Sequence, residues 1–259
     1  ILNLIMVIVF QLGVAGVAIA TVVSQLISCI LVLRVLMTTD EPYHISLSGL
    51  RINKRYLLRI MQIGVPAGLQ STLISFSNTL LQSSVNSLGY IAMAGYTAAN
   101  NLFGFCYICI NSVTQACMSF TSQNLGAGKF RRMDQILARC LLLEVLVGGF
   151  MGCFTYLLGH QLLGIYTSDE EVIRRGFEIL TVAAVPYFLC GFMDLFPGAM
   201  RGMGHSTVPM VLSLVGTVGT RLVWIYGIFP RNRTLGCLFL SYPVSWLVTL
   251  LLQIICYYF

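Results

Sequence analysis

Long apolar runs separated by short polar connectors make up most of the chain. A helix that crosses a bilayer needs about 20 predominantly apolar residues. Seven runs reach that length, at residues 14–36, 63–88, 90–121, 136–163, 176–200, 208–229 and 235–259. Residues 1–10 are too short to span and are interpreted as the tail of a helix whose start is missing. The pattern therefore predicts an all-α protein, a polytopic membrane helix bundle.

The segment at residues 37–62 follows the first predicted span and has a different pattern. Pro42 and Gly49 are typical of a loop, whereas Arg51, Arg55 and Arg59 recur every four residues among apolar positions of residues 50–61. Basic side chains above apolar ones are typical of a helix lying on an anionic membrane face. A solvated cytoplasmic loop is the alternative. Three parts are thus predicted, at residues 1–36, 37–62 and 63–259.

Two consecutive predicted spans are too polar to face lipid on all sides. At about 100° per residue in a helix, the polar side chains of each span gather on one face. The first stripe consists of Ser71, Ser75, Asn78 and Gln82, and the second of Thr97, Asn100, Gly104, Asn111, Gln115 and Ser122. We expect the two stripes to border a water-filled cavity. Hydrogen bonding between helices in a dry bundle is the alternative.

One acid lies in the most irregular apolar run, residues 186–204, which two prolines interrupt. Because hydrocarbon offers a carboxylate no water, an acid at that depth is a candidate functional residue. Asp194 shares a helix face with Tyr187, Gly191 and Gly198, and Pro197 is expected to disturb the helix. We expect room beside the acid for water, a cation or a substrate, with proton and cation competing for the carboxylate. Alternatively, a neighbouring helix satisfies Asp194, or Asp194 caps a kink.

Two other charged residues, Glu144 and Arg221, also lie at membrane depth. A charge at that depth either finds a partner or extends its polar end toward the interface. We therefore expect structural roles for both, as a pair with each other or as side chains reaching the interface.

Glycines spaced four residues apart occur within two of the predicted spans and at the end of a third. Such spacing lets helix backbones approach closely. The pairs are Gly64/Gly68, Gly148/Gly152 and Gly198/Gly202. We expect these pairs to mark helix packing.

Composition supports the membrane assignment. Hydrophobic residues make up 57% of the 259 residues, charged residues 9%, and the mean hydropathy is +0.85, whereas soluble domains are about 25% charged. The connectors at residues 34–59, 129–139 and 201 hold ten basic residues, against four at residues 168–175 and 231–233. By the positive-inside rule the first set is cytoplasmic. We therefore expect a multi-pass protein of the plasma membrane, in which the excess of basic residues marks topology and no nucleic acid is bound.

Motifs for enzymatic or metal chemistry are missing from the sequence. The nine cysteines lie almost wholly in apolar runs, where free cysteine behaves as a small hydrophobic residue. Cys106 and Cys109 form a single CxxC without a second pair or a histidine at metal spacing. The run GAGK at residues 126–129 resembles a phosphate loop, but Gln123 stands where the first glycine is needed. We expect no enzyme activity, no metal and no cofactor.

Four strings, taken together in their order and spacing, resemble the second half of the multidrug and toxic compound extrusion (MATE) family of antiporters. They are GVAGVAIATVVSQ at residues 13–25, GVPAGLQ at 64–70, SQNLGAGK at 122–129 and RGMGHSTVPM at 201–210. The resemblance implies twelve helices in two six-helix lobes, with the substrate cavity between them. Residues 1–36 would be the end of helix five and helix six of the first lobe, and residues 63–259 helices seven to twelve of the second.

The acids of this sequence depart from the family's pattern. Some branches carry a glutamate about two turns after the helix-seven proline, where this chain has Ile74, and an aspartate roughly one turn before Asp194, where it has Cys190. The other arrangement in the family places the coupling acid on helix one, which this chain does not contain. The resemblance therefore implies that Asp194 belongs to the second-lobe cavity and modulates coupling.

The resemblance also implies a secondary active transporter that works as a monomer in the lipid bilayer. It would export drugs or other amphipathic, cationic organic compounds in exchange for H+ or Na+. The residues expected to line its cavity and bind substrate are Gln70, Asn78, Gln82, Asn100, Asn111, Gln115, Tyr187 and Asp194. A flippase for a lipid-linked precursor is one alternative, and Arg221 facing the cavity would favour it. A non-transporting membrane scaffold or degenerate half is another, and dry packing along Asn100, Asn111 and Gln115 would favour it.

Overall fold

The structure is a computed structural model that describes residues 2–40, 44–46, 49 and 51–258. Within these residues all regular secondary structure is helical, which confirms the predicted all-α class. The chain divides into two units, residues 1–57 and 58–259. The boundary between them falls in the first turn of helix α3 (Lys54–Asn86).

The helical elements that lie wholly within the first unit are the short helix α1 (Leu2–Leu4), the π-helical segment η1 (Ile5–Val9) and the long helix α2 (Gly13–Thr38). Between η1 and α2 the chain reverses, and Gln11 and Gly13 there have φ angles of 51° and 53°. The large apolar side chains of α2 are mostly exposed. Helix α2 contains the span predicted at residues 14–36, and such exposure is expected of a helix surrounded by lipid.

The surface helix predicted at residues 50–61 is not a separate element. Leu50 lies outside the described residues, and residues 51–53 are not helical. The helix that begins at Lys54 continues through Pro66 and includes most of the span predicted at residues 63–88. A contact of residues 54–61 with the membrane face stays a prediction.

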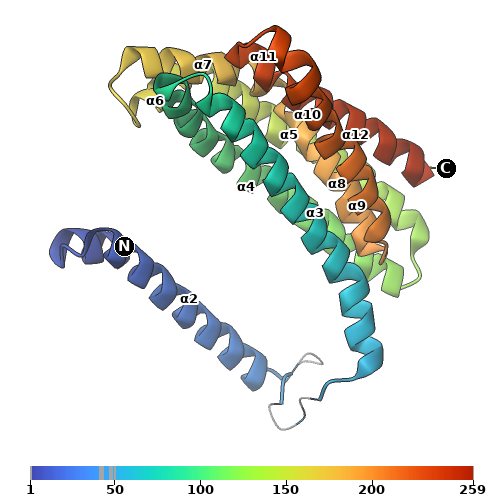
Figure 1. The fold of residues 1–259 in the computed structure, drawn as a ribbon. Coiled ribbons are helices and arrows are strands. Elements are labelled where there is room, and N and C mark those ends of the chain that lie inside the picture. The colour runs from blue at the N-terminus through green and yellow to red at the C-terminus, as the bar shows by residue number, and fades with distance from the viewer. Residues whose placement is uncertain (1, 41–43, 47–48, 50, 259) are drawn as a thin grey trace. The chain divides into compact units, whose positions relative to one another are not determined.

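The second unit is a bundle of long helices that run side by side (Figure 1). After α3 come α4 (Tyr90–Gly126), α5 (Phe130–Leu157), α6 (Gly159–Gly164), α7 (Glu170–Ala183), η3 (Val185–Tyr187), α8 (Phe188–Gly202) and α9 (Thr207–Ser213). The chain ends with η4 (Leu214–Gly219), α10 (Thr220–Val223), η5 (Trp224–Ile228), η6 (Phe229–Arg231), α11 (Leu235–Phe239) and α12 (Ser241–Tyr258). Helix α4 packs against α5, α7 and α8, so it lies at the centre of the bundle's core.

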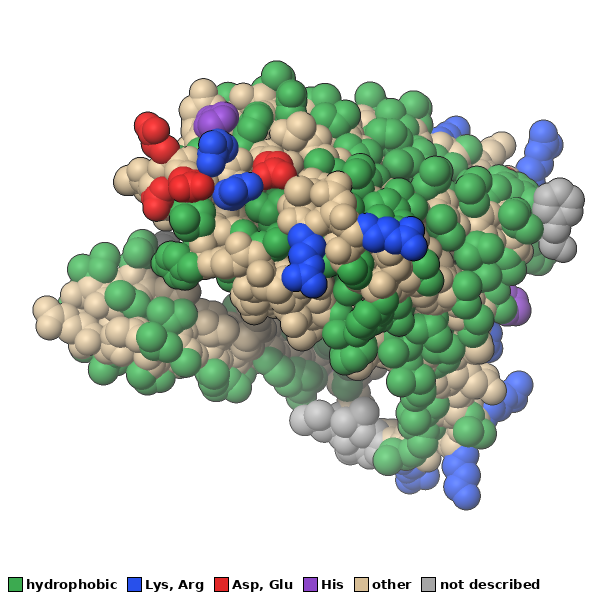
Figure 2. Space-filling model, turned by 45° about the horizontal axis from the view of Figure 1, so that its top comes forward, with side chains coloured by type: hydrophobic (Ala, Val, Ile, Leu, Met, Phe, Trp, Pro, Cys, Tyr) green, Lys and Arg blue, Asp and Glu red, His purple; other side chains and the backbone are tan. Residues whose placement is uncertain are grey.

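Five helical segments of the described residues are long and apolar enough to cross a membrane: Gly13–Thr38, Tyr90–Gly126, Phe130–Leu157, Thr207–Arg231 and Leu235–Tyr258. A sixth, formed by Glu170–Ala183 and Val185–Gly202, passes the same test but is bent by 49°. Seven spans were predicted, and six segments pass this test. The predicted span that does not pass lies in α3, because the many polar side chains of α3 lower its hydropathy. Hydrophobic side chains cover much of the face in Figure 2, and its acidic side chains gather in one place. Extended apolar surface of this kind is typical of contact with lipid.

The bent pair breaks at Pro186 and not at Pro197, where the sequence predicted the disturbance. Pro186 lies in the single 3-10 turn η3, whereas Pro197 lies inside α8, which continues to Gly202. A proline removes one helix hydrogen bond, and its ring clashes with the preceding turn. Pro197 is buried, and α8 is held on three sides by α4, α5 and α12. Packing therefore keeps α8 helical through Pro197.

Two of the three predicted glycine pairs lie at close helix contacts. A Cβ atom added at Gly152 would overlap the carbonyl oxygen of Ala184, so α5 directly contacts the end of α7. The pairs with such contacts are Gly148/Gly152 and Gly198/Gly202. A Cβ atom added at Gly64 or Gly68 would meet no neighbouring atom within 4 Å among the described residues. The spacing thus predicted packing correctly for α5 and α8 but not for α3.

Candidate functional site

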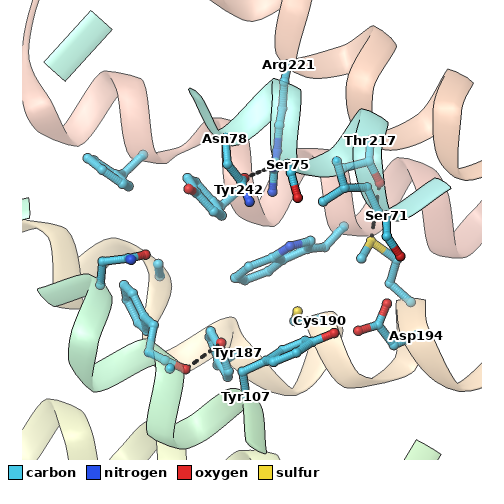
Figure 3. Close-up of a pocket in the computed structure, with 18 of the residues that line it drawn as sticks. Ser71, Ser75, Asn78, Tyr107, Tyr187, Cys190, Asp194, Thr217, Arg221 and Tyr242 are labelled. Carbon is cyan, nitrogen blue, oxygen red and sulfur yellow. Dashed lines mark hydrogen bonds between the residues drawn. The ribbon is translucent and has the colours of Figure 1, made fainter. Parts of the chain in front are cut away.

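A cavity of about 420 Å³ lies in the second unit, bordered chiefly by α3, α4, α8, α10 and α12 (Figure 3). Helix α3 contributes the polar side chains Ser71, Ser75 and Asn78. Helix α8 contributes Cys190 and Asp194. The remaining walls are largely aromatic. The cavity thus joins polar and aromatic surfaces from helices that are far apart in sequence.

Four of the eight predicted site residues line this cavity: Asn78, Asn100, Tyr187 and Asp194. Asn78 and Asn100 come from the two polar stripes, on α3 and α4. The two stripes therefore do meet at a cavity, as the periodicity of the polar residues predicted. The dry packing that would have favoured a scaffold is not found at Asn100.

Three predicted residues on the same stripes lie outside the cavity lining. Gln82 and Gln115 are exposed, and Asn111 is half-buried with its Nδ2 donating to the Tyr107 hydroxyl at 3.4 Å. Helical periodicity shows which face of a helix a residue occupies, but not how far along that face a cavity extends. The cavity borders the stripe on α3 from Ser71 to Asn78, and the stripe on α4 only at Asn100 and Gly104.

Gln70 was predicted to line the cavity, but the structure places it in a buried contact between helices. Its Nε2 donates to the Ser213 hydroxyl at 2.9 Å, and its Oε1 accepts a hydrogen bond from Arg201. These two bonds join α3 to α9 and to the end of α8. With both ends of its amide occupied, Gln70 holds helices together, and it is not among the residues that line the cavity.

Asp194 is half-buried in the cavity wall, where the Tyr107 side chain lies beside its carboxyl group (Figure 3). Arg201, two turns further along α8, is the basic residue whose charge acts on it most strongly. Ion pairs within 4.0 Å are found in the described part of the chain only between Arg174 and Glu171 and between Arg175 and Glu178. The Asp194 carboxylate therefore faces the cavity without a bound counter-charge.

Arg221 is a second charged residue of the cavity. Pairing with Glu144, one of the two roles expected for it, is not found in the described part of the chain. Arg221 Nη1 donates to Asn78 Oδ1 at 2.7 Å and its Nε to the Ser245 hydroxyl at 3.3 Å. The guanidinium carbon lies 4.3 Å from the centre of the Tyr242 ring, a favourable cation–π distance. Arg221 therefore joins α10 to α3 and α12, whereas α5, which carries Glu144, packs on α4 and α8.

Most of the aromatic lining was not predicted. Tyr187 stacks on Phe103 with ring centres 5.3 Å apart, donates its hydroxyl proton to the Phe103 carbonyl oxygen at 3.1 Å, and meets Trp246 edge-on at 5.6 Å. Tyr96, Phe103 and Tyr107 recur at helical spacing on α4 and all reach the cavity. That spacing, on a helix with a polar stripe, was the signal that could have revealed them.

The cavity can bind a molecule with both apolar and charged parts. Ligand pockets are commonly apolar and aromatic with a few polar groups that fix orientation, and aromatic faces also attract cations. Asp194 and Arg221 carry opposite charges, and Figure 3 shows them among different neighbours. The lining therefore offers an aromatic surface with one acidic and one basic position.

The MatE family model matches residues 66–226 of the chain. The chain is 26% identical over 247 residues to the probable multidrug resistance protein YoeA of Bacillus subtilis, an alignment that covers 93% of this chain and 53% of YoeA. It is 25% identical over 208 residues to the multidrug export protein MepA of Staphylococcus aureus, covering 80% of this chain and 46% of MepA. The chain thus spans about half the length of these curated relatives.

Solved structures of similar fold cover nearly the whole chain. A mutant of the MATE transporter VcmN of Vibrio cholerae superposes with a TM-score of 0.86 at 19% identity, covering 99% of this chain and 58% of VcmN. An outward-facing multidrug resistance transporter of the MATE family superposes with a TM-score of 0.85 at 20% identity, covering 98% of this chain and 58% of that transporter. At such identities the superpositions establish a shared fold, which is the fold that the sequence strings implied.

Proposed function

Because the chain belongs to the MatE family of multidrug and toxic compound extrusion transporters, we propose that the full-length protein exports amphipathic, cationic organic compounds in exchange for H+ or Na+. The chain is a multi-pass membrane protein, in bacteria one of the plasma membrane. The observation that carries the proposal is an acid, Asp194, without an ion-pair partner among the described residues, in the aromatic wall of a cavity.

The chemistry of the cavity suits cationic amphipathic compounds. Aromatic side chains give such a molecule a large apolar contact, and their faces attract its positive charge. Asp194 supplies a full negative charge in a setting where water is limited, so its attraction for a cation exceeds that at a protein surface. Neutral polar side chains such as those of Asn78 and Ser75 can hydrogen-bond the polar groups of substrates that differ in shape.

Exchange follows when a substrate cation and a coupling ion compete for the same carboxylate. A proton that binds Asp194 removes the negative charge of its carboxylate, and a Na+ that binds there compensates that charge. Either event weakens binding of the cationic substrate. Because the ion and the substrate then bind in alternation, entry of one accompanies release of the other.

The bent helix pair supports a transport role for this part of the molecule. Transporters commonly bind substrates beside interrupted membrane helices near the middle of the bilayer. Here the 49° bend between α7 and α8 directly precedes the helix that carries Asp194. A change in the bend would move Asp194 relative to α3 and α4.

Efflux measurements on the full-length protein test the proposal. Vesicles containing the wild-type protein should accumulate or expel a fluorescent cationic dye when a pH or Na+ gradient is applied. The variant Asp194→Asn should lose most of this gradient-driven transport. Asp134→Asn, an exposed acid near the start of α5, is the matched control and should transport normally. Unchanged coupled export by Asp194→Asn would remove Asp194 from the mechanism, and no dye transport by the wild type would contradict the proposed function.

One observation favours a second candidate, a flippase for a lipid-linked precursor. Arg221 lines the cavity, and a guanidinium suits the phosphate groups of such a precursor. Arg221 is, however, the sole Lys or Arg side chain of the cavity's described lining, and Asp194 shares that lining. An assay with a fluorescent phospholipid-linked substrate separates the candidates, because a flippase would move this substrate and ignore the cationic dye.

A further inference from the structure

Besides Asp194, the bundle contains an acid that is completely buried and has no hydrogen-bond partner among the described residues. Glu144, on α5, has 0% exposed surface. Neither of its carboxyl oxygens has a hydrogen-bond partner among the described residues. Polar groups in protein interiors are almost always hydrogen-bonded, so this residue requires an explanation.

The surroundings of Glu144 are formed by α5 and by the bent pair. A Cβ atom added at Gly191 of α8 would overlap the Glu144 carboxyl group. Gly148 and Gly152, one and two turns further along α5, lie against Phe188 and Ala184. The face of α5 that carries Glu144 therefore packs against α8 at Gly191 and Phe188, and further along α5 it packs against Ala184, which precedes the break at Pro186.

The ionisable groups around Glu144 include no nearby cation. Cys140 interacts with it from its own helix, and Cys190 and Asp194 interact with it from α8. The described residues of α4, α6, α7 and η3 add no charged group that acts on it. Every neighbour that can ionise would thus carry a negative charge, the same sign as a Glu144 carboxylate.

A metal ion does not suit this environment. Na+, like other hard cations, needs several oxygen ligands, whereas the Glu144 oxygens have no polar partner in the described residues. No group of three or more His, Cys, Asp or Glu side chains that could hold a metal is found in the described part of the chain. A proton is the one cation that a lone carboxyl group can bind by itself.

An isolated carboxylate in an apolar interior is very costly, whereas a neutral carboxyl group is much less so. We propose that Glu144 is a second proton-binding site of this lobe, occupied in the conformation described here, and that its proton exchanges with the cavity when α8 moves. This inference rests on the proposed transport function for its role in exchange. The binding of the proton itself does not depend on transport.

The exchange step needs only water as a reactant. When α8 moves away from α5, water reaches the carboxyl group, the O–H bond of Glu144 breaks, and the proton forms a bond to a water oxygen. The hydronium ion passes the proton on to the Asp194 carboxylate or to bulk water. Glu144 is left as a hydrated carboxylate, and the reverse steps reload it.

Infrared spectroscopy of the purified full-length protein tests the proton site without any transport assay. A protonated carboxyl group has a carbonyl stretching band that a carboxylate lacks. At neutral pH the wild type should show a band that is absent in Glu144→Gln and retained in Asp194→Asn. In D2O this band should shift slowly, because no water contacts the group. If the wild-type protein shows no slowly exchanging carboxyl band, the proposal is wrong, and this result does not require any variant to fold.

Transport measurements test the role in exchange. Glu144→Gln, which keeps the shape and the neutral state, should bind substrate but lose part of the pH dependence of its export. Glu144→Asp should restore pH dependence, which a purely structural role would not predict. An unchanged pH profile in Glu144→Gln would contradict the exchange role. If the wild type transports no dye but the band behaves as described, the proposed function fails and the proton site stands.

Discussion

The contact between α5 and the end of α7 gives a sharp prediction about packing at the helix break. Gly152→Ala adds a Cβ atom that would overlap the carbonyl oxygen of Ala184. This oxygen belongs to the backbone one residue before η3, so it cannot move aside as a flexible side chain would. The helices must separate, or the break must change, to admit the added methyl group.

The neighbouring residue on the same helix is a matched control. Gly149 has no atom within 4 Å of an added Cβ, so Gly149→Ala tests the helix alone. Alanine is favoured over glycine in a helix by up to about 1 kcal/mol, and this gain is common to both variants. Overpacking costs about 1–3 kcal/mol. We therefore expect Gly152→Ala to be less stable than Gly149→Ala by about 1–3 kcal/mol.

Denaturant unfolding of the full-length protein in mixed micelles measures the difference between the two variants. Both proteins should first be shown to elute as single, well-folded species. Equal stability of Gly152→Ala and Gly149→Ala would refute the reasoning, because it would mean that α5 and the end of α7 are not in direct backbone contact.

Two further predictions concern the cavity wall. Tyr187→Phe removes the hydrogen bond to the Phe103 carbonyl oxygen but keeps the stacked ring, so it should lower the free energy of unfolding by about 0.5–1.5 kcal/mol while leaving dye affinity nearly unchanged; a dye titration and a denaturation curve check both. Arg221→Gln removes a charged donor that bonds to α3 and α12, so it should lower the free energy of unfolding by about 1.5–3 kcal/mol. Arg221→Lys should recover little of this loss, since an ammonium group cannot reproduce the planar, multiple donors of a guanidinium.

The helical spans could be predicted from sequence because hydrocarbon imposes one simple requirement, a long apolar run. The exceptions arose where packing opposes local preference. Pro197 should disturb a helix, yet α8 continues through it because three helices surround it. Pro186 has the same backbone chemistry, and there the chain breaks. Nothing in the local sequence distinguishes the two prolines, because the difference lies in the neighbours that each one has.

The candidate site was predictable in part for a similar reason. The helical period placed Asn78 and Asn100 on the faces that meet at the cavity. It placed Gln82 and Gln115 on the same faces, although the cavity does not reach them. The extent of the cavity depends on where α8 and α12 approach α3 and α4, which are contacts between segments distant in sequence. The same limit applies to Arg221, whose partners lie 143 and 24 residues away.

Taken together, the two proposals predict that ion binding at the two acids of this lobe is coupled. Asp194 lies in the cavity wall, and Glu144 lies against Gly191, three residues earlier on α8. Two neighbouring carboxylates repel each other, so ionising one makes ionising the other harder. A substrate cation bound at Asp194 cancels this repulsion and therefore favours release of the proton from Glu144. By reciprocity of linked equilibria, a proton on Glu144 weakens binding of the cation. Substrate and proton would thus oppose each other's binding, which is the thermodynamic requirement for exchange.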